Sequence, residues 1–280
     1  MKGRGGPTAA PGRHALVTGA SSGIGEAFAR RLAQCGVDLL ISARPEEREP
    51  LERLARDLVE RHGIRCHAVA VDLALASGVD ELHAAAQQRS FVPDVLVNNA
   101  GVGASGAFGS SPLEAQLRML HVNVDAVLRL TRLFLDAPAV RDRGAIVNIA
   151  STAAFQPQPY FAVYAASKAF LLRFGEALWA EQRRSGVRVV TVCAGPVAAT
   201  GRTRRREGPV REFLKRRYLT VDDVVDGALA GLERDRPVVV LRMPLLGRAY
   251  HVRTLLGLLL TRRARLRAAE RLNRWYFERT

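Results

Sequence analysis

The sequence predicts an α/β fold, a doubly wound parallel sheet of about seven strands with helices on both faces. Short runs rich in Val, Ile and Leu alternate with segments whose apolar residues recur at helical spacing. The strand runs are almost continuously apolar, which is typical of parallel strands buried on both faces. A chain of 280 residues with 48% hydrophobic content can build one such domain.

The first elements set the alternation. HALVTG is a short apolar strand closed by glycine, and the next segment has apolar residues at helical spacing before Gly36 stops it. VDLLISAR is then a buried strand, followed by a charged amphipathic helix that begins near Pro45 or Pro50. These elements are expected at 14–19, 23–36, 37–44 and 45–63.

The same alternation continues to the seventh strand. Further strands are expected at 67–73, 94–101, 144–151, 187–195 and 237–241. Helices are expected at 81–89, 112–135, 160–184 and 221–233. We therefore expect a disordered basic arm at 1–13, one domain at 14–244 with an arginine-rich substrate lid at 196–218, and an apolar then basic helical extension at 245–280.

Charge and cysteines exclude several classes of function. The net charge of +15 is concentrated in the arm, the lid and the extension, and no duplex-reading motif accompanies it, so no nucleic-acid partner is predicted. The three cysteines are widely spaced, which predicts neither a disulfide framework nor a metal site. The amino terminus lacks the apolar run of a signal peptide. Three buried thiols in a reducing compartment are predicted, so a cytoplasmic protein is expected.

A glycine-rich turn, TGASSGIG at 18–25, joins the first strand to the first helix. Gly19, Gly23 and Gly25 allow a tight turn and a close approach of the backbone to a pyrophosphate at the helix N-terminus. A simple turn is the alternative, but the strand–turn–helix context favours a Rossmann-type dinucleotide site.

The end of the second strand bears on which dinucleotide is bound. NAD sites usually have a carboxylate there for the ribose 2′-hydroxyl, whereas this chain has Ser42, Ala43 and Arg44. A guanidinium suits a 2′-phosphate, so the sequence favours NADP(H) over NAD(H). Arg44 as a solvated cap of the next helix is the alternative.

Polar residues follow the third and fourth strands, at the edge where such sheets bind ligands. Asp72 is positioned to accept a hydrogen bond from an adenine amine, or equally to cap a helix. Asn98, Asn99 and Gly101 can line a cofactor or form a plain turn.

Tyr164 and Lys168 stand four residues apart on one face of a predicted helix. A nearby ammonium stabilises a phenolate and lowers the pKa of the phenol from about 10. Such a pair makes an acid/base, although a surface pair is the alternative. Ser151, at the end of the fifth strand, is expected at the same edge of the sheet. Only Lys2, Lys168 and Lys215 among 42 basic residues are lysines.

Six motifs, TGASSGIG, NNAG, HVNV, IVNIAS, YAASK and AGPV, together resemble those of the classical short-chain dehydrogenase/reductase family over residues 14–241. The resemblance implies that Tyr164 is the catalytic acid/base and that Lys168 lowers its pKa and holds the nicotinamide ribose. It further implies that Ser151 orients the substrate oxygen and that Asn123 holds a water of the proton relay. The chain departs from the family by having Ala194, Gly195 and Pro196 where Pro-Gly is common.

The implied function is an NADPH-dependent carbonyl reductase acting on a hydrophobic ketone or acyl-type substrate, in a homodimer or homotetramer. A catalytically silent NADP-binding regulatory or membrane-surface protein is the alternative. The substrate is expected against Ser151, Gly103, Phe108, Phe155 and Tyr160. The cofactor is expected against Gly19, Ser21, Ser22, Gly23, Ile24, Gly25, Arg44, Asp72, Leu73, Asn99, Ala100, Gly101, Tyr164, Lys168, Gly195 and Val197.

The sequence of 245–280 is compatible with two interpretations. Its apolar half followed by a basic, aromatic-ended half is compatible with peripheral contact with an anionic membrane. Packing on the body or on a second subunit is the other reading.

Overall fold

The computed structural model describes residues 13–198 and 218–241 and a few positions of the extension, 266–267, 270–271 and 274. The described residues form a seven-stranded parallel sheet in the order β3-β2-β1-β4-β5-β6-β7. The strands are β1 (His14–Thr18), β2 (Asp38–Ala43), β3 (Cys66–Ala70), β4 (Val95–Asn98), β5 (Ala145–Ile149), β6 (Arg188–Ala194) and β7 (Val238–Leu241). The predicted fold class is confirmed.

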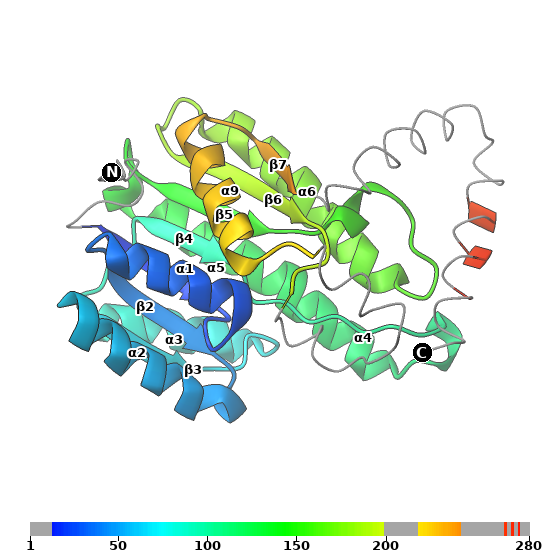
Figure 1. Ribbon diagram of the computed structural model, residues 1–280, viewed down its shortest axis with the longest axis horizontal. Helices are drawn as coiled ribbons and strands as arrows, with labels where there is room; N and C mark the ends of the chain where they lie inside the picture. Colours follow the sequence, from blue (N-terminus) through cyan, green and yellow to red (C-terminus); the bar gives the residue numbers. More distant parts are fainter. Residues whose placement is uncertain (1–12, 199–217, 242–265, 268–269, 272–273, 275–280) are drawn as a thin grey trace.

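Helices cover both faces of this sheet (Figure 1). One layer consists of α1 (Gly23–Gln34), α2 (Arg48–His62) and α9 (Val221–Glu233). The other contains α3 (Ala76–Gln88), α5 (Ala126–Asp136) and α6 (Ala162–Gln182), with α4 (Leu113–Leu120) leading into α5 through a π-helical segment, His121–Asp125. No helix within the described ranges has the length and apolar character needed to cross a membrane.

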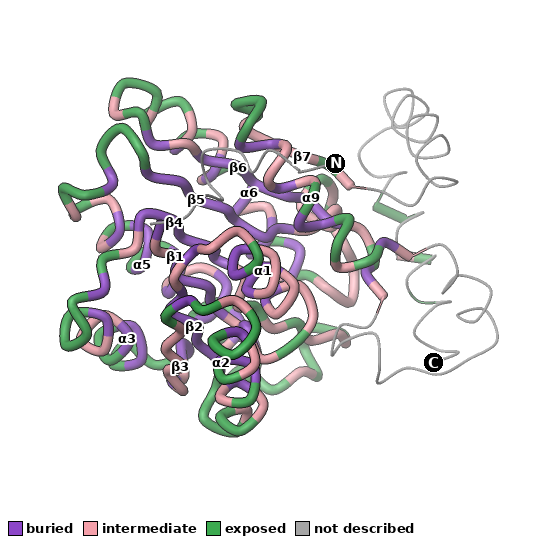
Figure 2. Tube along the Cα trace, turned by 60° about the vertical axis from the view of Figure 1, so that its left-hand side comes forward, coloured by how far each residue is buried: buried purple, intermediate pink, exposed green. Residues whose placement is uncertain are grey.

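The core has two main clusters, because alternate residues of each strand point to opposite faces. Val17, Ile41 and Val97 pack with the layer of α1, α2 and α9. Leu16 and Leu40 pack with the opposite layer. Figure 2 shows the buried strands passing between helices whose outer surfaces are exposed. Burial on both faces explains why the strands read as continuous apolar runs.

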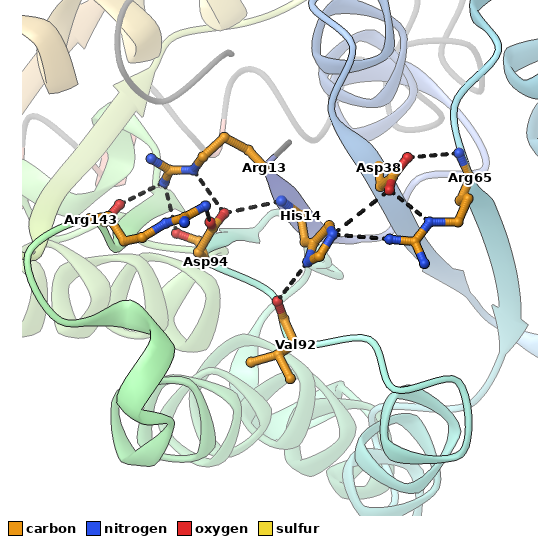
Figure 3. Close-up of polar contacts among 7 residues, drawn as sticks. All are labelled: Arg13, His14, Asp38, Arg65, Val92, Asp94 and Arg143. Carbon is orange, nitrogen blue, oxygen red and sulfur yellow. Dashed lines mark hydrogen bonds and ion pairs between the residues drawn. The ribbon is translucent and has the colours of Figure 1, made fainter. Parts of the chain in front are cut away.

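A polar network holds the amino ends of the strands together (Figure 3). The buried Arg13 donates through Nε to Asp94 Oδ1 at 2.9 Å and through Nη2 to the Arg143 carbonyl at 2.6 Å. On the other side of β1, Arg65 Nε donates to Asp38 Oδ2 at 2.8 Å. Arg13 therefore belongs to the folded body rather than to the expected arm at 1–13, of which residues 1–12 lie outside the described residues.

The carboxyl ends of β1 and β4 are adjacent, although α1, β2, α2, β3 and α3 separate them in the chain. Strand order reverses at this point, and ligands of such sheets bind in the crevice it leaves. The predicted lid also starts at this edge. Its ends are joined, because Ala198 N donates to the Leu219 carbonyl at 2.8 Å, while 199–217 lie outside the described residues.

Helix α3 begins at Ala76, five positions before the predicted start at 81. The additional turn contains Gly78, a residue that disfavours helix. A Cβ at Gly78 would clash with the Asp72 carbonyl oxygen, so glycine is required there by packing. Tertiary contact therefore overrides local propensity at this end of the helix.

Candidate active site

The glycine turn lies between β1 and α1. Gly19 and Gly23 have φ angles of +66° and +62°, in the region that favours glycine. A Cβ at Gly19 would lie 2.9 Å from Ala100 Cα, and one at Gly25 would clash with the Gly19 carbonyl oxygen. The backbone of the turn thus packs directly against the segment that follows β4, with no room for a side chain at Gly19 or Gly25.

The N-terminus of α1 suits an anion. Ser22 is the N-cap residue, but its side chain makes no cap hydrogen bond to the helix. The first-turn N–H groups are therefore not occupied by that hydroxyl, and the positive end of the helix dipole lies at the turn. These features fit a pyrophosphate. Ile24, also expected at the cofactor, is partly buried against the core.

Thr18 and Asn99 lock the turn to the end of β4. Thr18 Oγ1 accepts hydrogen bonds from the backbone of Asn99 at 3.1 Å and of Ala100 at 3.0 Å. Asn99 Nδ2 donates to the carbonyls of Thr18 at 2.8 Å and Gly19 at 3.0 Å. The Asn99 amide therefore positions the turn, and its contact with a cofactor stays a prediction.

Lys168 lies inside the molecule, with only 4% of its surface exposed. Its Nζ donates to the Ile149 carbonyl, at the end of β5, at 2.8 Å. A Cβ built on Gly101 would lie 3.4 Å from this Nζ and 3.3 Å from Asn123 Oδ1. The ammonium is therefore held at the carboxyl edge of the sheet, next to the loop that follows β4.

Asn123 lies in the π-helical segment between α4 and α5 and is fully buried. Its Oδ1 accepts from Val102 N at 2.9 Å, and its Nδ2 donates to the Val102 carbonyl and to Ser167 Oγ, both at 3.0 Å. Ser167 Oγ in turn donates to the Tyr164 carbonyl at 2.8 Å. Asn123 therefore connects the loop after β4 to the turn of α6 that carries Tyr164 and Lys168.

Tyr164 and Ser151 approach from two elements. Tyr164 is near the start of α6, is 8% exposed, and has its ring 6.2 Å from that of Phe161. Ser151 follows β5 and caps a short 3-10 helix, Thr152–Phe155, by accepting a hydrogen bond from Ala153 N at 3.2 Å. Because Lys168 Nζ donates to the Ile149 carbonyl, two residues before Ser151, α6 contacts the end of β5 here, and a shared site of Ser151 and Tyr164 stays a prediction.

Arg44, which directly follows β2, forms an ion pair with Glu47. Its Nη2 donates to Glu47 Oε1 at 2.7 Å, and Ser21 Oγ of the glycine turn donates to Glu47 Oε2 at 2.7 Å. The hydrogen bond to Glu47 raises the pKa of Arg44. A carboxylate therefore lies close to the expected 2′-phosphate position, although the residues at the end of β2 itself, Ser42 to Arg44, include no acid.

Asp72 is committed to protein partners in this structure. Both of its oxygens accept from Arg118, at 2.9 and 3.0 Å, and Oδ1 also accepts from Ala74 N at 3.0 Å. Burial would raise its pKa, but these hydrogen bonds and the Arg118 charge lower it. Helix α3 has Leu75 as its N-cap residue, so Asp72 does not cap it. Its contact with adenine stays a prediction, as does that of the buried Leu73.

The expected substrate residues occupy two adjacent loops. Gly106 N donates to the Tyr160 carbonyl at 2.9 Å, which joins the loop of Gly103 and Phe108 to the loop before α6. The side chains of Phe108 and Phe155 are exposed. Tyr160 OH donates to Glu270 Oε1 at 3.5 Å, so this part of the extension at 245–280 contacts the body beside the expected substrate position.

The residues after β6 are partly described. Gly195 N donates to the Leu241 carbonyl at 2.9 Å, and Val197 is buried and pairs with Leu219. The turn that departs from the Pro-Gly pattern is thus anchored to β7. Cofactor contact at these two residues stays a prediction.

Comparison with known families decides the assignment. A family model described as short chain dehydrogenase matches residues 13–209. This chain belongs to the short-chain dehydrogenase family. It is therefore an oxidoreductase, and the resemblance drawn from the six motifs is confirmed.

Relatives of this short-chain dehydrogenase include reductases. It is 40% identical over 196 residues to a putative ketoacyl reductase of Streptomyces coelicolor, covering 67% of this chain and 73% of that protein. It is 31% identical over 237 residues to the probable oxidoreductase EphD of Mycobacterium tuberculosis, covering 79% of this chain but only 40% of EphD. A solved short-chain dehydrogenase from Sphingobium yanoikuyae in complex with NADPH has a TM-score of 0.72 and 29% identity, covering 89% of this chain and 97% of that one.

Sequence reasoning on this short-chain dehydrogenase missed three supporting residues, Thr18, Glu47 and Ser167. Thr18 precedes the first glycine of the turn, and Ser167 lies inside the YAASK motif, so both stood beside residues already singled out. Glu47 follows Arg44 by three residues, a spacing at which side chains in a helical turn meet. That spacing was the signal that could have revealed the pair.

Proposed function

We propose that this protein is an NADPH-dependent carbonyl reductase that converts a hydrophobic ketone, of the β-ketoacyl type, to a secondary alcohol. The observation that carries the proposal is the position of Lys168. Its ammonium is buried at the carboxyl end of β5, one helical turn from Tyr164 and next to the loop after β4.

The glycine turn and the uncapped N-terminus of α1 would hold the pyrophosphate of the dinucleotide. Arg44 would face the ribose 2′-phosphate, and Lys168 the nicotinamide ribose. When bound, the dinucleotide supplies or accepts a hydride. The S. yanoikuyae relative was solved with NADPH, which supports this choice of cofactor.

The chain's own groups supply orientation and the proton. Ser151 would donate a hydrogen bond to the carbonyl oxygen of the ketone and fix its direction. Tyr164 would give its phenolic proton to that oxygen as the alcohol forms, with Lys168 stabilising the resulting phenolate. Asn123 would maintain the loop and helix that set these distances.

The substrate class follows from the surroundings and from the relatives. Phe108 and Phe155 expose apolar surface in the loops where the substrate is expected, and the S. coelicolor relative is a putative ketoacyl reductase. A ketone carried on an acyl chain would place its apolar part on these aromatic residues.

The test is to offer the purified chain β-ketoacyl thioesters, steroid ketones and quinones with NADPH or NADH. Coenzyme oxidation and alcohol formation are both measured, with Tyr164→Phe as the comparison enzyme. We expect NADPH to reduce a β-ketoacyl thioester. The amount of alcohol formed should equal the amount of NADPH oxidised. Absence of turnover with every ketone, while NADPH binds, would disprove the reductase.

A further inference from the structure

Glu47 lies between two groups that are expected to bind the dinucleotide. One carboxylate oxygen accepts from Arg44 Nη2 and the other from Ser21 Oγ, each at 2.7 Å. Arg44 follows β2 and Ser21 is in the glycine turn, so a single side chain bridges both. Each oxygen of Glu47 is thus directed at one of these two groups.

The backbone keeps Glu47 in this place. It ends a short 3-10 helix, Pro45–Glu47, whose first residue is a proline, and its N–H donates to the Arg44 carbonyl at 2.9 Å. Proline fixes φ and so limits the freedom of this turn. The bridge therefore rests on a restrained backbone as well as on side-chain rotamers.

The carboxylate is charged at neutral pH. Partial burial would raise the pKa of Glu47, but the hydrogen bonds from Ser21 and Arg44 and the Arg44 charge lower it. A ribose 2′-phosphate brought to Arg44 would compete with this carboxylate for the guanidinium and would be repelled by its negative charge. A free 2′-hydroxyl would instead donate a hydrogen bond to it.

We propose, building on the function above, that Glu47 is a specificity-determining residue that weakens the preference for NADP(H), so that the enzyme binds NAD(H) as well. Arg44 attracts the 2′-phosphate, and Glu47 opposes it and serves the 2′-hydroxyl. The ratio of the two affinities is then set by this pair rather than by Arg44 alone.

The test compares wild type, Glu47→Gln and Glu46→Gln by titration calorimetry with NADPH, NADH and adenosine 2′,5′-bisphosphate. Glutamine keeps the size of the side chain and removes its charge. Glu46→Gln is the matched control. It removes the same charge from the neighbouring residue, whose side chain is exposed. We expect Glu47→Gln to raise the NADPH-to-NADH affinity ratio about tenfold, and to tighten adenosine 2′,5′-bisphosphate similarly. Glu46→Gln should change the ratio less than about twofold.

Three results would overturn the proposal. The first is an unchanged NADPH-to-NADH affinity ratio in Glu47→Gln. The second is a fall in that ratio, which would mean that Glu47 orients Arg44 for the phosphate. The third is an equal rise of the ratio in Glu46→Gln. If wild type binds NADPH and NADH and only the ratio fails to respond, the specificity role alone is wrong. If wild type binds neither dinucleotide, the proposed function falls with it.

Discussion

Lys168 is one of three lysines in a chain with 42 basic residues, and its surroundings explain why arginine does not replace it. Its Nζ fits between the Ile149 carbonyl and the backbone of Gly101, inside the molecule. A guanidinium is planar and larger than an ammonium and needs several acceptors in one plane. The space is therefore specific for a compact cation.

Lys168→Arg tests this at the level of one side chain. We expect the variant to lose at least about 1 kcal/mol of unfolding free energy, because the larger group must displace packed neighbours. Its kcat should fall about a hundredfold or more, since the cation leaves its position near Tyr164. Urea unfolding and steady-state kinetics measure the two effects, with Arg173→Lys, on the exposed face of α6, as the control. A variant as stable and active as wild type would refute the tight fit.

At this scale the sequence predicted backbone requirements better than side-chain pairings. The positive φ of Gly19 and Gly23 follows from the turn that a strand–helix junction needs, and the turn was predicted. The contact of Glu47 with Ser21 was not, because these residues lie in separate elements and their meeting depends on side-chain rotamers. For the same reason the Asp72–Arg118 pair, which joins residues far apart in the sequence, was not predicted.

Among the elements, the helix that runs from α4 to α5 supports the site through its π-helical segment. The sequence predicts one helix at 112–135, and the structure confirms its continuity but adds the π-helical segment. A π-helical turn changes the directions in which its side chains point, and such turns are often found at functional sites. Here it presents Asn123 to the loop after β4 and to Ser167. Apolar periodicity alone cannot reveal such an insertion.

Asn123→Leu tests what this segment contributes. Leucine is similar in volume but leaves Val102 N and Ser167 Oγ without their Asn123 partner, which costs about 1–3 kcal/mol of unfolding free energy for each buried group. For the two groups together we expect a loss of about 2–6 kcal/mol and a fall in kcat. His121→Ala, on the exposed side of the same segment, should change stability by less than about 0.5 kcal/mol. Equal stability of the two variants in urea unfolding would show that the Asn123 hydrogen bonds are unimportant.

Over the whole molecule, the amino ends and the carboxyl ends of the strands have different roles. The amino edge is closed by the ion-pair network of Figure 3, while the carboxyl edge carries the glycine turn, Lys168 and Ser151. Glu270 of the extension contacts Tyr160 of the body, while how 245–280 packs as a whole stays a prediction. Membrane contact of 245–280 and a homo-oligomer stay predictions.

Stability should depend on pH through the carboxylates of this fold. Burial would raise the pKa of Asp38, but hydrogen bonds from the Arg65 backbone and guanidinium, and the charge of Arg65, lower it. A carboxyl whose pKa is lowered by folding stabilises the protein above its unfolded pKa of about 4. That contribution is lost as pH falls through the lower folded value.

Asp38→Asn therefore has a pH-dependent effect. At pH 7 we expect it to cost about 1 kcal/mol of unfolding free energy, discounted because Arg65 is largely exposed. The difference from wild type should shrink as pH falls below about 4, where the carboxyl of the unfolded chain becomes protonated, and should be gone below the lower pKa of the folded state. Urea unfolding over this range measures it, with the exposed Asp80→Asn as control. A constant difference at all pH values would contradict the assignment.

The most direct measurement of the catalytic account is the kcat of Tyr164→Phe for reduction of the ketone that wild type prefers, together with the dissociation constant of NADPH. Loss of the phenolic proton should lower kcat by about 10²–10⁴-fold. NADPH affinity should stay within about threefold of wild type, since only the proton donor is removed. A Tyr164→Phe enzyme with wild-type kcat would contradict the account, because the proton would then come from another group.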